Sequence, residues 1–315
     1  MPQVLKLNRP WLVAVWPGMG HVALNAGVYL LAKLEMTAFA EFQASDLFEV
    51  DHIEVKDGLI QPGKRPKNRF FFRADPNKRH DLVVFVGEAQ PPAGKYPFCR
   101  QLIEFAKNLG VERVFTFAAM ATRMNPADEA RVFAAATDEE NLDELKRLEL
   151  TVLEDGNIGG LNGVLLAVAA EAGLHGACLL GEMPHIFAQL PFPKASQAIL
   201  EVFATLADLD LDLTELAEQA RVIEKQLGEI LARVEEQIGD QTGSDEEEEE
   251  GTQIEPVPEP AVAQAVRDRI ESLFGQVKAD RSKAFELKQE LDRLGLFKEY
   301  EDRFLDLFQK NNGGK

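Results

Sequence analysis

The chain has 315 residues, of which 45% are hydrophobic and 28% are charged, and its formal net charge is −19. This composition can build a sizeable hydrophobic core and excludes a wholly disordered chain. So acidic a surface repels phosphate backbones, and the most basic stretch, residues 64–69, is short and typical of a solvated loop, so no nucleic-acid partner is expected. The longest apolar run, Val164 to Ala170, is far shorter than the roughly 20 residues that cross a bilayer, so no membrane segment is expected.

The N-terminal region lacks the apolar core of a secretory signal, because Pro17 and Gly18 interrupt its first hydrophobic run. A cytoplasmic location is therefore expected. Cys99 and Cys178 lie far apart in segments that read as buried, which fits reduced thiols in the core and predicts neither a disulfide framework nor a zinc site. We expect no cofactor and no metal.

The first predicted unit is a strand, a glycine turn and a helix. Trp11 to Trp16 form a continuous apolar run, as a strand buried on both faces requires. The turn Pro17-Gly18-Met19-Gly20 ends this strand, and residues 22–34 then follow helical spacing. A second strand is predicted over residues 37–43.

The middle of the chain repeats this alternation of strands and helices. Strands are predicted over residues 81–86, 111–118 and 177–180, helices over 98–109 and from the glycine loop 159–163 to Ala172, and shorter antiparallel additions over 48–60 and 69–74. Strands that alternate with helices predict an α/β fold in layers, with a mostly parallel sheet covered by helices on both faces.

A heptad pattern follows the predicted α/β body. Apolar residues recur there with spacings of three and four, the a/d stripe of a coiled coil: Leu213, Leu216, Ala220, Ile223, Leu227, Ile230 and Val234. The stripe predicts an interaction helix, and two alternatives stay open because three heptads are close to the minimum for this pattern. The helix either packs on its own body or associates with another chain.

Composition divides the chain into three parts. Residues 1–240 are predicted to form the α/β domain with its heptad helix. Residues 241–260 contain the run Glu246 to Glu250 and three prolines, which predicts a disordered acidic linker that keeps the chain soluble or contacts basic partners. Residues 261–315 predict a helical appendage, which has too little core to be stable alone and should dock on the body or on a partner.

Six segments, four of which contain glycine, match one family in order and spacing. They are Trp16 to Gly20, Gly87 to Pro91, Gly156 to Leu166 (GNIGGLNGVLL), Cys178 to Pro184 (CLLGEMP), Pro191 to Ser196 and Leu209 to Leu213. Over about residues 8–238 the chain thereby resembles the second proteasome-assembly-chaperone family. The resemblance implies a fold similar to that of nucleoside phosphorylases, self-association into a homo-oligomer and, in archaeal and eukaryotic relatives, escorting of proteasome α-subunits.

The C-terminal sequence departs from this family. Relatives that dock on the proteasome end in a hydrophobic residue, a tyrosine and any residue, whereas this chain ends in Asn311 to Lys315. That docking mode is not expected here. A binding role in a different assembly, or with no proteasome present, is as compatible with the resemblance as protein partners that are proteasome-like subunits.

Two glycine loops are candidate anion sites. Gly18, Gly20 and Ala23 formally satisfy the G-x-G-x-x-G/A pattern between a strand and a helix, where backbone N–H groups can hold a phosphate or a carboxylate. The acidic partner of a dinucleotide site is weak, because Glu41 falls inside the predicted second strand, so a tight turn is the favoured alternative. The second loop contains Gly160, Asn162 and Gly163, with Asn162 as a candidate helix cap. Neither loop ends in the Gly-Lys-Ser/Thr of a P-loop.

Four titratable residues follow strand ends and could gather at the carboxyl edge of a parallel sheet. They are Glu88, Glu182, His21 and His185. If they converged, they could perform acid–base chemistry or hold a metal ion, but separate loop hydrogen bonds are the favoured alternative. No G-x-S-x-G elbow is present, so serine hydrolase chemistry is not predicted.

These observations favour a protein-binding, assembly-chaperone-like chain that self-associates over an enzyme. The alternative is a small-molecule or nucleotide-binding enzyme, phosphorylase-like or similar to carboxylate-amine ligases. Its candidate ligand residues would be Gly18, Gly20, His21, Glu88, Gly160, Asn162, Gly163 and Glu182.

Overall fold

The computed structural model describes residues 6–48, 53, 55–56, 58–61, 63, 65–148, 150–241 and 260–309, apart from the side chains of 45, 234–241 and 260–265. Apart from its two end residues, the acidic linker predicted over 241–260 lies outside the described residues, and so do residues 310–315.

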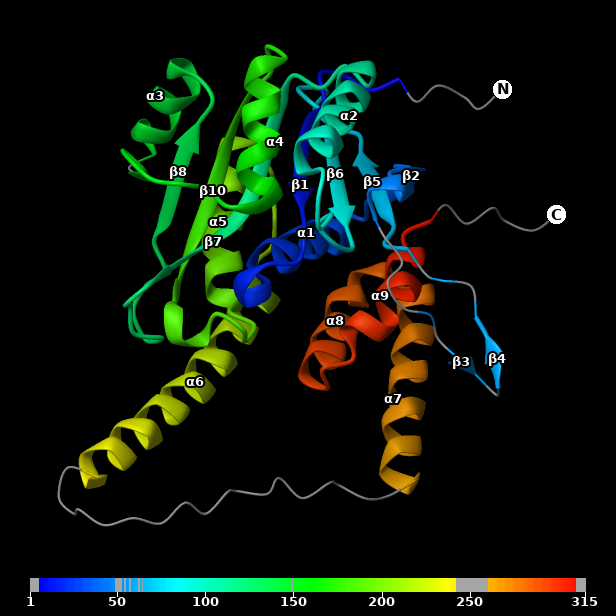
Figure 1. The fold of residues 1–315 in the computed structure, drawn as a ribbon, viewed down its shortest axis with the longest axis vertical. Coiled ribbons are helices and arrows are strands. Elements are labelled where there is room, and N and C mark those ends of the chain that lie inside the picture. Colours follow the sequence, from blue (N-terminus) through cyan, green and yellow to red (C-terminus); the bar gives the residue numbers. More distant parts are fainter. Residues whose placement is uncertain are drawn as a thin grey trace.

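One sheet of eight strands, in the order β2-β5-β6-β1-β7-β10-β8-β9, forms the centre of the molecule (Figure 1). The strands are β1 (Trp11–Val15), β2 (Thr37–Glu41), β5 (Asn68–Arg73), β6 (Leu82–Gly87), β7 (Arg113–Thr122), β8 (Val132–Ala136), β9 (Thr151–Val152) and β10 (His175–Pro184). The four central strands, β6, β1, β7 and β10, are mutually parallel. At one side β5 pairs antiparallel with both β6 and β2, and at the other β8 pairs antiparallel with β10.

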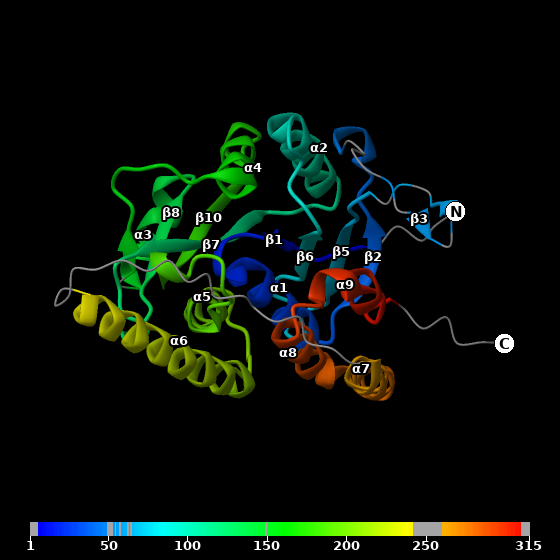
Figure 2. The ribbon, with the colours of Figure 1, turned by 60° about the horizontal axis from the view of Figure 1, so that its bottom comes forward.

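Helices cover both faces of this sheet (Figure 2). One face carries α2 (Lys95–Asn108) and α4 (Gly160–Glu171), the other carries α1 (Val22–Lys33) and α5 (Pro193–Leu206), and α3 (Glu139–Arg147) lies beside β8. The predicted α/β class, with its mostly parallel sheet and two helical layers, is confirmed. Short 3₁₀ turns span Met19–His21, Ser45–Leu47, His185–Phe187 and Arg281–Lys283.

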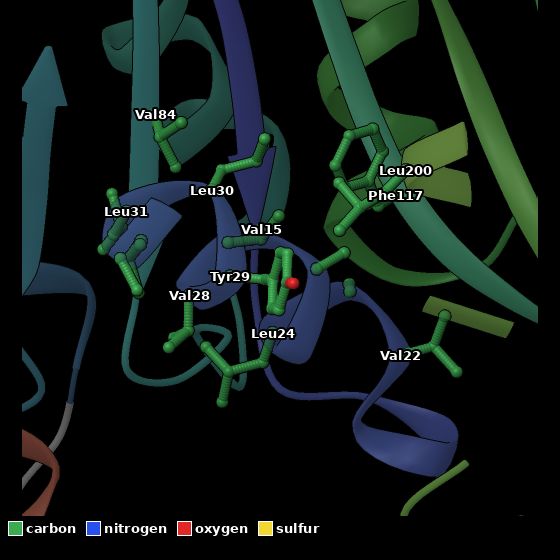
Figure 3. Close-up of a cluster of buried hydrophobic side chains, with 14 of the residues drawn as sticks. Val15, Val22, Leu24, Val28, Tyr29, Leu30, Leu31, Val84, Phe117 and Leu200 are labelled. Carbon is green, nitrogen blue, oxygen red and sulfur yellow. The ribbon is translucent and has the colours of Figure 1, made fainter. Parts of the chain in front are cut away.

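Strand β1 shows why its sequence is apolar at every position. Val13 and Val15 pack with α1 and α5, whereas Leu12, Ala14 and Trp16 at its end pack with α2 and α4, and all five are at most 1% exposed. Successive side chains of a strand point to opposite faces, so a strand covered on both sides must be apolar throughout. Figure 3 shows the hydrophobic cluster that Val15 forms with the buried side chains of α1.

Strand β10 is longer than the sequence indicates. The predicted strand ended before Gly181, but β10 continues to Pro184 and pairs with β7 along its whole length. Gly181 lies within the strand and packs against α5. A Cβ at this position would lie only 2.5 Å from the Ala195 carbonyl oxygen, so α5 can approach the sheet this closely only at a glycine. The prediction treated this glycine as a strand end and was wrong on that point.

The C-terminal helices extend the α1/α5 layer. They are α6 (Thr214–Gln241), α7 (Pro260–Ala279), α8 (Ala284–Arg293) and α9 (Phe297–Asp306). We call residues 260–309 the C-terminal appendage. Ala38 of β2 donates a backbone hydrogen bond of 2.8 Å to Phe308, and the rings of Phe308 and Phe71 are 6.1 Å apart. The appendage therefore covers the β2–β5 side of the sheet (Figure 2). None of the helices in the described part of the chain is long and apolar enough to span a membrane.

Two short strands, β3 (Val55–Lys56) and β4 (Leu59–Ile60), form a separate antiparallel pair that projects from the body (Figure 1). The sequence predicted antiparallel additions in this region, and the pair lies outside the main sheet.

A buried polar contact links the appendage to the body. Lys288 of α8 is only 1% exposed, and its Nζ donates to Asn25 Oδ1 of α1 at 2.7 Å and also to Asp292. The ammonium also lies 4.2 Å from the centre of the Phe297 ring, a cation–π contact. A buried charge is tolerated only where such partners replace its hydration. These contacts therefore favour one orientation of α8 on α1.

We expect Lys288→Met to destabilise the protein by about 3–5 kcal/mol, because Asp292 and Asn25 lose their buried partner. Replacing the pair together, with Lys288→Met and Asp292→Leu, should recover most of that loss. Unfolding in urea measures both changes. Lys225→Met, at a lysine whose side chain is 82% exposed on α6, is the matched control and should have little effect. Equal stability of the Lys288→Met protein and the wild type would contradict this prediction.

Candidate functional site

The first glycine loop is bonded to a neighbouring loop of the same chain. Gly20 donates its N–H to the Ala188 carbonyl at 2.9 Å and accepts from Phe192 N–H at 2.9 Å, while His21 N–H donates to Gly18 at 3.1 Å. The loop between β10 and α5 thus occupies the Gly20 N–H, and the Gly18 carbonyl occupies the His21 N–H, so neither donor is open to an anion. The imidazole of His21 is half-buried, and burial together with the nearby Lys288 ammonium lowers its pKa, while Asp292 raises it.

The second glycine loop is capped by Gln90. Leu161, near the start of α4, donates its N–H to Gln90 Oε1 at 3.1 Å, and Gln90 Nε2 donates to the Pro17 carbonyl at 3.3 Å. Gly160 adopts a left-handed φ of 69°, and a Cβ there would lie 2.7 Å from Gln90 Oε1, so glycine is needed for this contact. Gln90 therefore occupies one N–H group of the helix N-terminus that the sequence suggested for a ligand, and it joins the two glycine loops.

Asn162 and Gly163 lie on the first turn of α4. The Asn162 carbonyl accepts a hydrogen bond from Thr116 Oγ1 at 3.3 Å, while its buried Oδ1 has no partner among the described residues. Gly163 permits close packing, because a Cβ there would lie 2.2 Å from the Ile158 carbonyl oxygen.

Glu88 follows the end of β6 and belongs to a buried ionic cluster. Its Oε1 accepts from Arg69 Nη1 at 2.7 Å, and its Oε2 accepts from the Lys67 N–H at 2.8 Å. Arg69 also contacts Asp302 of α9, and Lys298 of α9 donates to the Glu88 carbonyl at 2.8 Å. Burial raises the pKa of Glu88 to about 7, and the Lys67 and Arg69 contacts only partly oppose this shift. Glu88 thus lies where the C-terminal appendage meets the sheet.

Glu182 near the end of β10 has its own cation. Arg131 donates to it through Nη2 at 2.6 Å and Nε at 2.8 Å, and Thr122 Oγ1 donates at 2.8 Å. The Arg131 contact lowers the pKa of Glu182. Nδ1 of His185 lies 2.8 Å from the Thr122 carbonyl oxygen, on the same side of the sheet's carboxyl edge.

The structure does not bring Glu88 and Glu182 together. Strands β1 and β7 lie between β6 and β10, which at about 4.8 Å per strand places the two strand ends roughly 14 Å apart. Each carboxylate is instead paired with an arginine that the motif analysis did not select, Arg69 or Arg131. The sequence placed Arg69 both at the end of a solvated basic loop and at the start of a strand over residues 69–74. It belongs to strand β5, and its side chain is only 5% exposed, so the solvated loop was wrong for this residue. Among the described residues, no group of three or more His, Cys, Asp or Glu is placed to hold a metal ion.

The heptad stripe of α6 has two environments. Leu216, Ala220 and Leu227 are buried, and the first half of α6 packs on α5. Leu213 and Ile223 are half-buried, Ile230 is 43% exposed, and the side chain of Val234 lies outside the described residues. The stripe is thus covered by the chain's own residues as far as Leu227, and Ile230 beyond it is open to solvent.

Two surfaces carry exposed large apolar side chains. On the β3–β4 pair these are Ile53, Val55, Leu59 and Ile60, which are 49–71% exposed. Between α6 and the appendage lies a groove of about 1000 Å³. Val222 and Ile230 are exposed and line it. Exposed apolar patches of this kind mark interaction surfaces.

The sheet, covered by helices on both faces, defines an α/β protein. The polar groups at the ends of its strands are bonded within the chain, and exposed apolar residues gather on the two surfaces just described. The PAC2 family model matches residues 12–231, so the chain belongs to the PAC2 family. It is 27% identical over 235 residues to an uncharacterized protein of Methanocaldococcus jannaschii, MJ1210, covering 74% of this chain and 87% of that protein.

Two solved structures are similar. Pyrococcus furiosus PbaB, an archaeal proteasome activator, has 26% sequence identity and a TM-score of 0.61, and the match covers 73% of this chain and 95% of that chain. Pyrococcus furiosus PbaA, an archaeal homolog of proteasome-assembly chaperone, has 25% identity and a TM-score of 0.57, with 76% and 94% covered. The appendage lies outside the residues that the family model matches.

Glu88 predicts a specific pH dependence of stability. Its pKa is higher in the folded protein, about 7, than its usual 4.5, so its contribution to stability is full below about pH 4.5 and is lost as pH rises through about 7. Between pH 5 and pH 8, the unfolding free energy of the wild type should therefore fall relative to that of Glu88→Gln, by up to about 3 kcal/mol. Denaturant unfolding at several pH values measures this. Glu104→Gln, at an exposed glutamate of α2, is the control, and parallel profiles of the Glu88→Gln protein and the wild type would refute the prediction.

Proposed function

We propose that the chain is an assembly-chaperone-like protein of the PAC2 family that binds subunits of a proteasome-like assembly and self-associates. The observation that carries the proposal is the match to PbaB, an archaeal proteasome activator, over 95% of that chain at 26% identity. This role would place the chain in the cytoplasm, the location expected from its sequence.

The geometry of the sheet edge supports protein binding over the alternative of an anion-binding enzyme. The N–H groups of Gly20, His21 and Leu161 are bonded to acceptors of the same chain. Glu88 and Glu182 are paired with separate arginines. An enzyme that used both glycine loops and both carboxylates would first have to break these contacts, whereas a protein that works through its surface leaves them intact.

The β3–β4 pair is the self-association surface in this proposal. Val55 and Ile60 are directly paired across the two strands and are 61% and 71% exposed. Paired residues lie on one face of the sheet, so these two side chains form a continuous apolar spot. A lone two-stranded pair is at best marginally stable in water, so a second copy packed on it would stabilise it. This is a site for a homo-oligomer that the heptad pattern did not indicate.

We expect light scattering on the purified protein to give a mass of more than one chain. Leu59→Glu with Ile60→Glu should reduce it to a single chain, because both side chains are at least 67% exposed and the charges would be buried only in the oligomer. Val222→Glu with Ile230→Glu, also at exposed apolar positions, is the matched control. A wild type that elutes with the mass of one chain at high concentration would rule out self-association.

Binding to proteasome subunits is tested separately. Purified proteasome α-type subunits, mixed with the chain and analysed by native mass spectrometry, should form a complex that a size-matched unrelated protein does not form. Peptidase assays on assembled 20S particles then show whether the chain activates them. Failure to form any complex with α-type subunits, in a protein that is folded, would remove the proteasome-like partner from the proposal.

A further inference from the structure

The groove between α6 and the C-terminal appendage is not used by any contact described above. Its volume is about 1000 Å³, and its two walls are α6 on one side and α7 with α8 on the other. The apolar lining residues are Leu190, Pro191, Val222, Ile223, Leu227, Ile230 and Leu273. A helix has a diameter of about 10 Å with its side chains, so this volume accommodates roughly two turns of one more helix between the walls.

The apolar residues of α6 in this groove are spaced to contact a helix. Ile223, Leu227 and Ile230 follow one another at intervals of four and three, the spacing that receives the side chains of a second helix. Val222 and Ile230 are 56% and 43% exposed and lie eight residues apart, about 12 Å along α6. Leu190, at one end of the groove, is 42% exposed. Between Val222 and Ile230, Ile223 is half-buried and Leu227 is only 3% exposed, so Val222 and Ile230 carry the part of this apolar seam that solvent reaches.

The charges at the groove select among the candidate occupants. Glu218 of α6 and Glu286 of α8 line it, are exposed, and form no ion pair within the described part of the chain. The arginines in the lining, Arg269 and Arg293, are both engaged by Glu290 at 2.8 Å. Lys283 also lines the groove and forms no ion pair within the described part of the chain, because its Nζ donates to Gln276 Oε1 at 3.2 Å. With Lys283 included, the lining carries five acidic and three basic side chains and so remains acidic.

A second copy of α6 fits these charges poorly. Residues 214–241 contain seven acidic and three basic residues, so the same helix placed beside Glu218 and Glu286 would add like charge. Like charges brought together at an interface oppose association. A basic helix would instead pair with both glutamates.

We propose that this groove binds an amphipathic helix of a partner protein, with an apolar stripe facing α6 and Lys or Arg residues flanking it to pair with Glu218 and Glu286. The inference rests on the proposed protein-binding function and names the class of partner segment. It corresponds to the helix-in-groove mode, in which residues at i, i+3, i+4 and i+7 of the bound helix supply the anchors.

The test measures binding of labelled synthetic peptides of about 20 residues to the full-length protein by fluorescence anisotropy. One peptide has leucines at heptad positions a and d with lysines beside them, the second replaces those lysines by glutamates, and the third scrambles the basic sequence. The basic amphipathic peptide should bind, and the acidic and scrambled peptides should bind at least about tenfold more weakly.

Matched variants locate the site. Val222→Glu with Ile230→Glu should lower the affinity for the basic peptide by about tenfold or more, whereas Leu59→Glu with Ile60→Glu, which changes the charge equally, should leave it unchanged. Glu218→Lys with Glu286→Lys should weaken the basic peptide and strengthen the acidic one. Glu104→Lys with Glu154→Lys, at exposed residues outside the groove, is the charge control.

The outcomes separate this inference from the proposed function. Equal binding of the scrambled peptide, or unchanged binding by the Val222/Ile230 variant, overturns the groove as a helix site while leaving self-association and α-subunit binding to their own tests. A fall in mass to a single chain for the Val222/Ile230 variant would show that a second copy occupies the groove, which also overturns the inference. Loss of peptide binding in that variant at unchanged mass supports it.

Discussion

The fold depends on four central strands that are buried on both faces and must be covered on both. Strands β6, β1, β7 and β10 carry apolar residues at nearly every position, and helices α2 and α4 cover one of their faces. On the other face, α1 and α5 do not reach the β2–β5 side of the sheet. The C-terminal appendage fills that position, so residues at opposite ends of the chain complete one hydrophobic layer.

Polar contacts fix the position of this last layer. An apolar interface tolerates small slips of one helix along another, whereas a buried ammonium or guanidinium must meet its partners. Lys288 meets Asn25 of α1, and Arg69 of β5 meets both Glu88 and Asp302. The Glu88 carboxylate at the sheet edge thereby serves docking of the appendage, and the raised pKa of Glu88 reflects its burial at this contact.

Much of the fold could be predicted from periodicity, because a buried parallel strand and an amphipathic helix each leave a local pattern. The apolar run of β1 and the spacing of α1 are examples. Strand β10 was cut short because Gly181 resembles a strand end in one dimension, although close approach of α5 is its cause. Arg131 and Arg69 could not be assigned to Glu182 and Glu88, since each pair is 19 to 51 residues apart and depends on strand order. Gln90 lies in the segment Gly87 to Pro91, which the family resemblance singled out, but only the fold shows that it bonds to the start of α4.

The groove lies between a helix of the region that the family model matches and the helices of the C-terminal appendage. The family model covers residues 12–231 and so includes one wall, α6, whereas the other wall, α7 and α8, lies beyond it. A chain that ended at α6 would present the stripe from Ile223 to Ile230 on an open helix surface. Placing α8 opposite that stripe converts the surface into a two-walled groove, with Glu286 facing the same space as Glu218. The Lys288 contact that stabilises α8 on α1 therefore also positions one wall of the groove, and it would link the stability of the appendage to the helix binding that we propose for this groove.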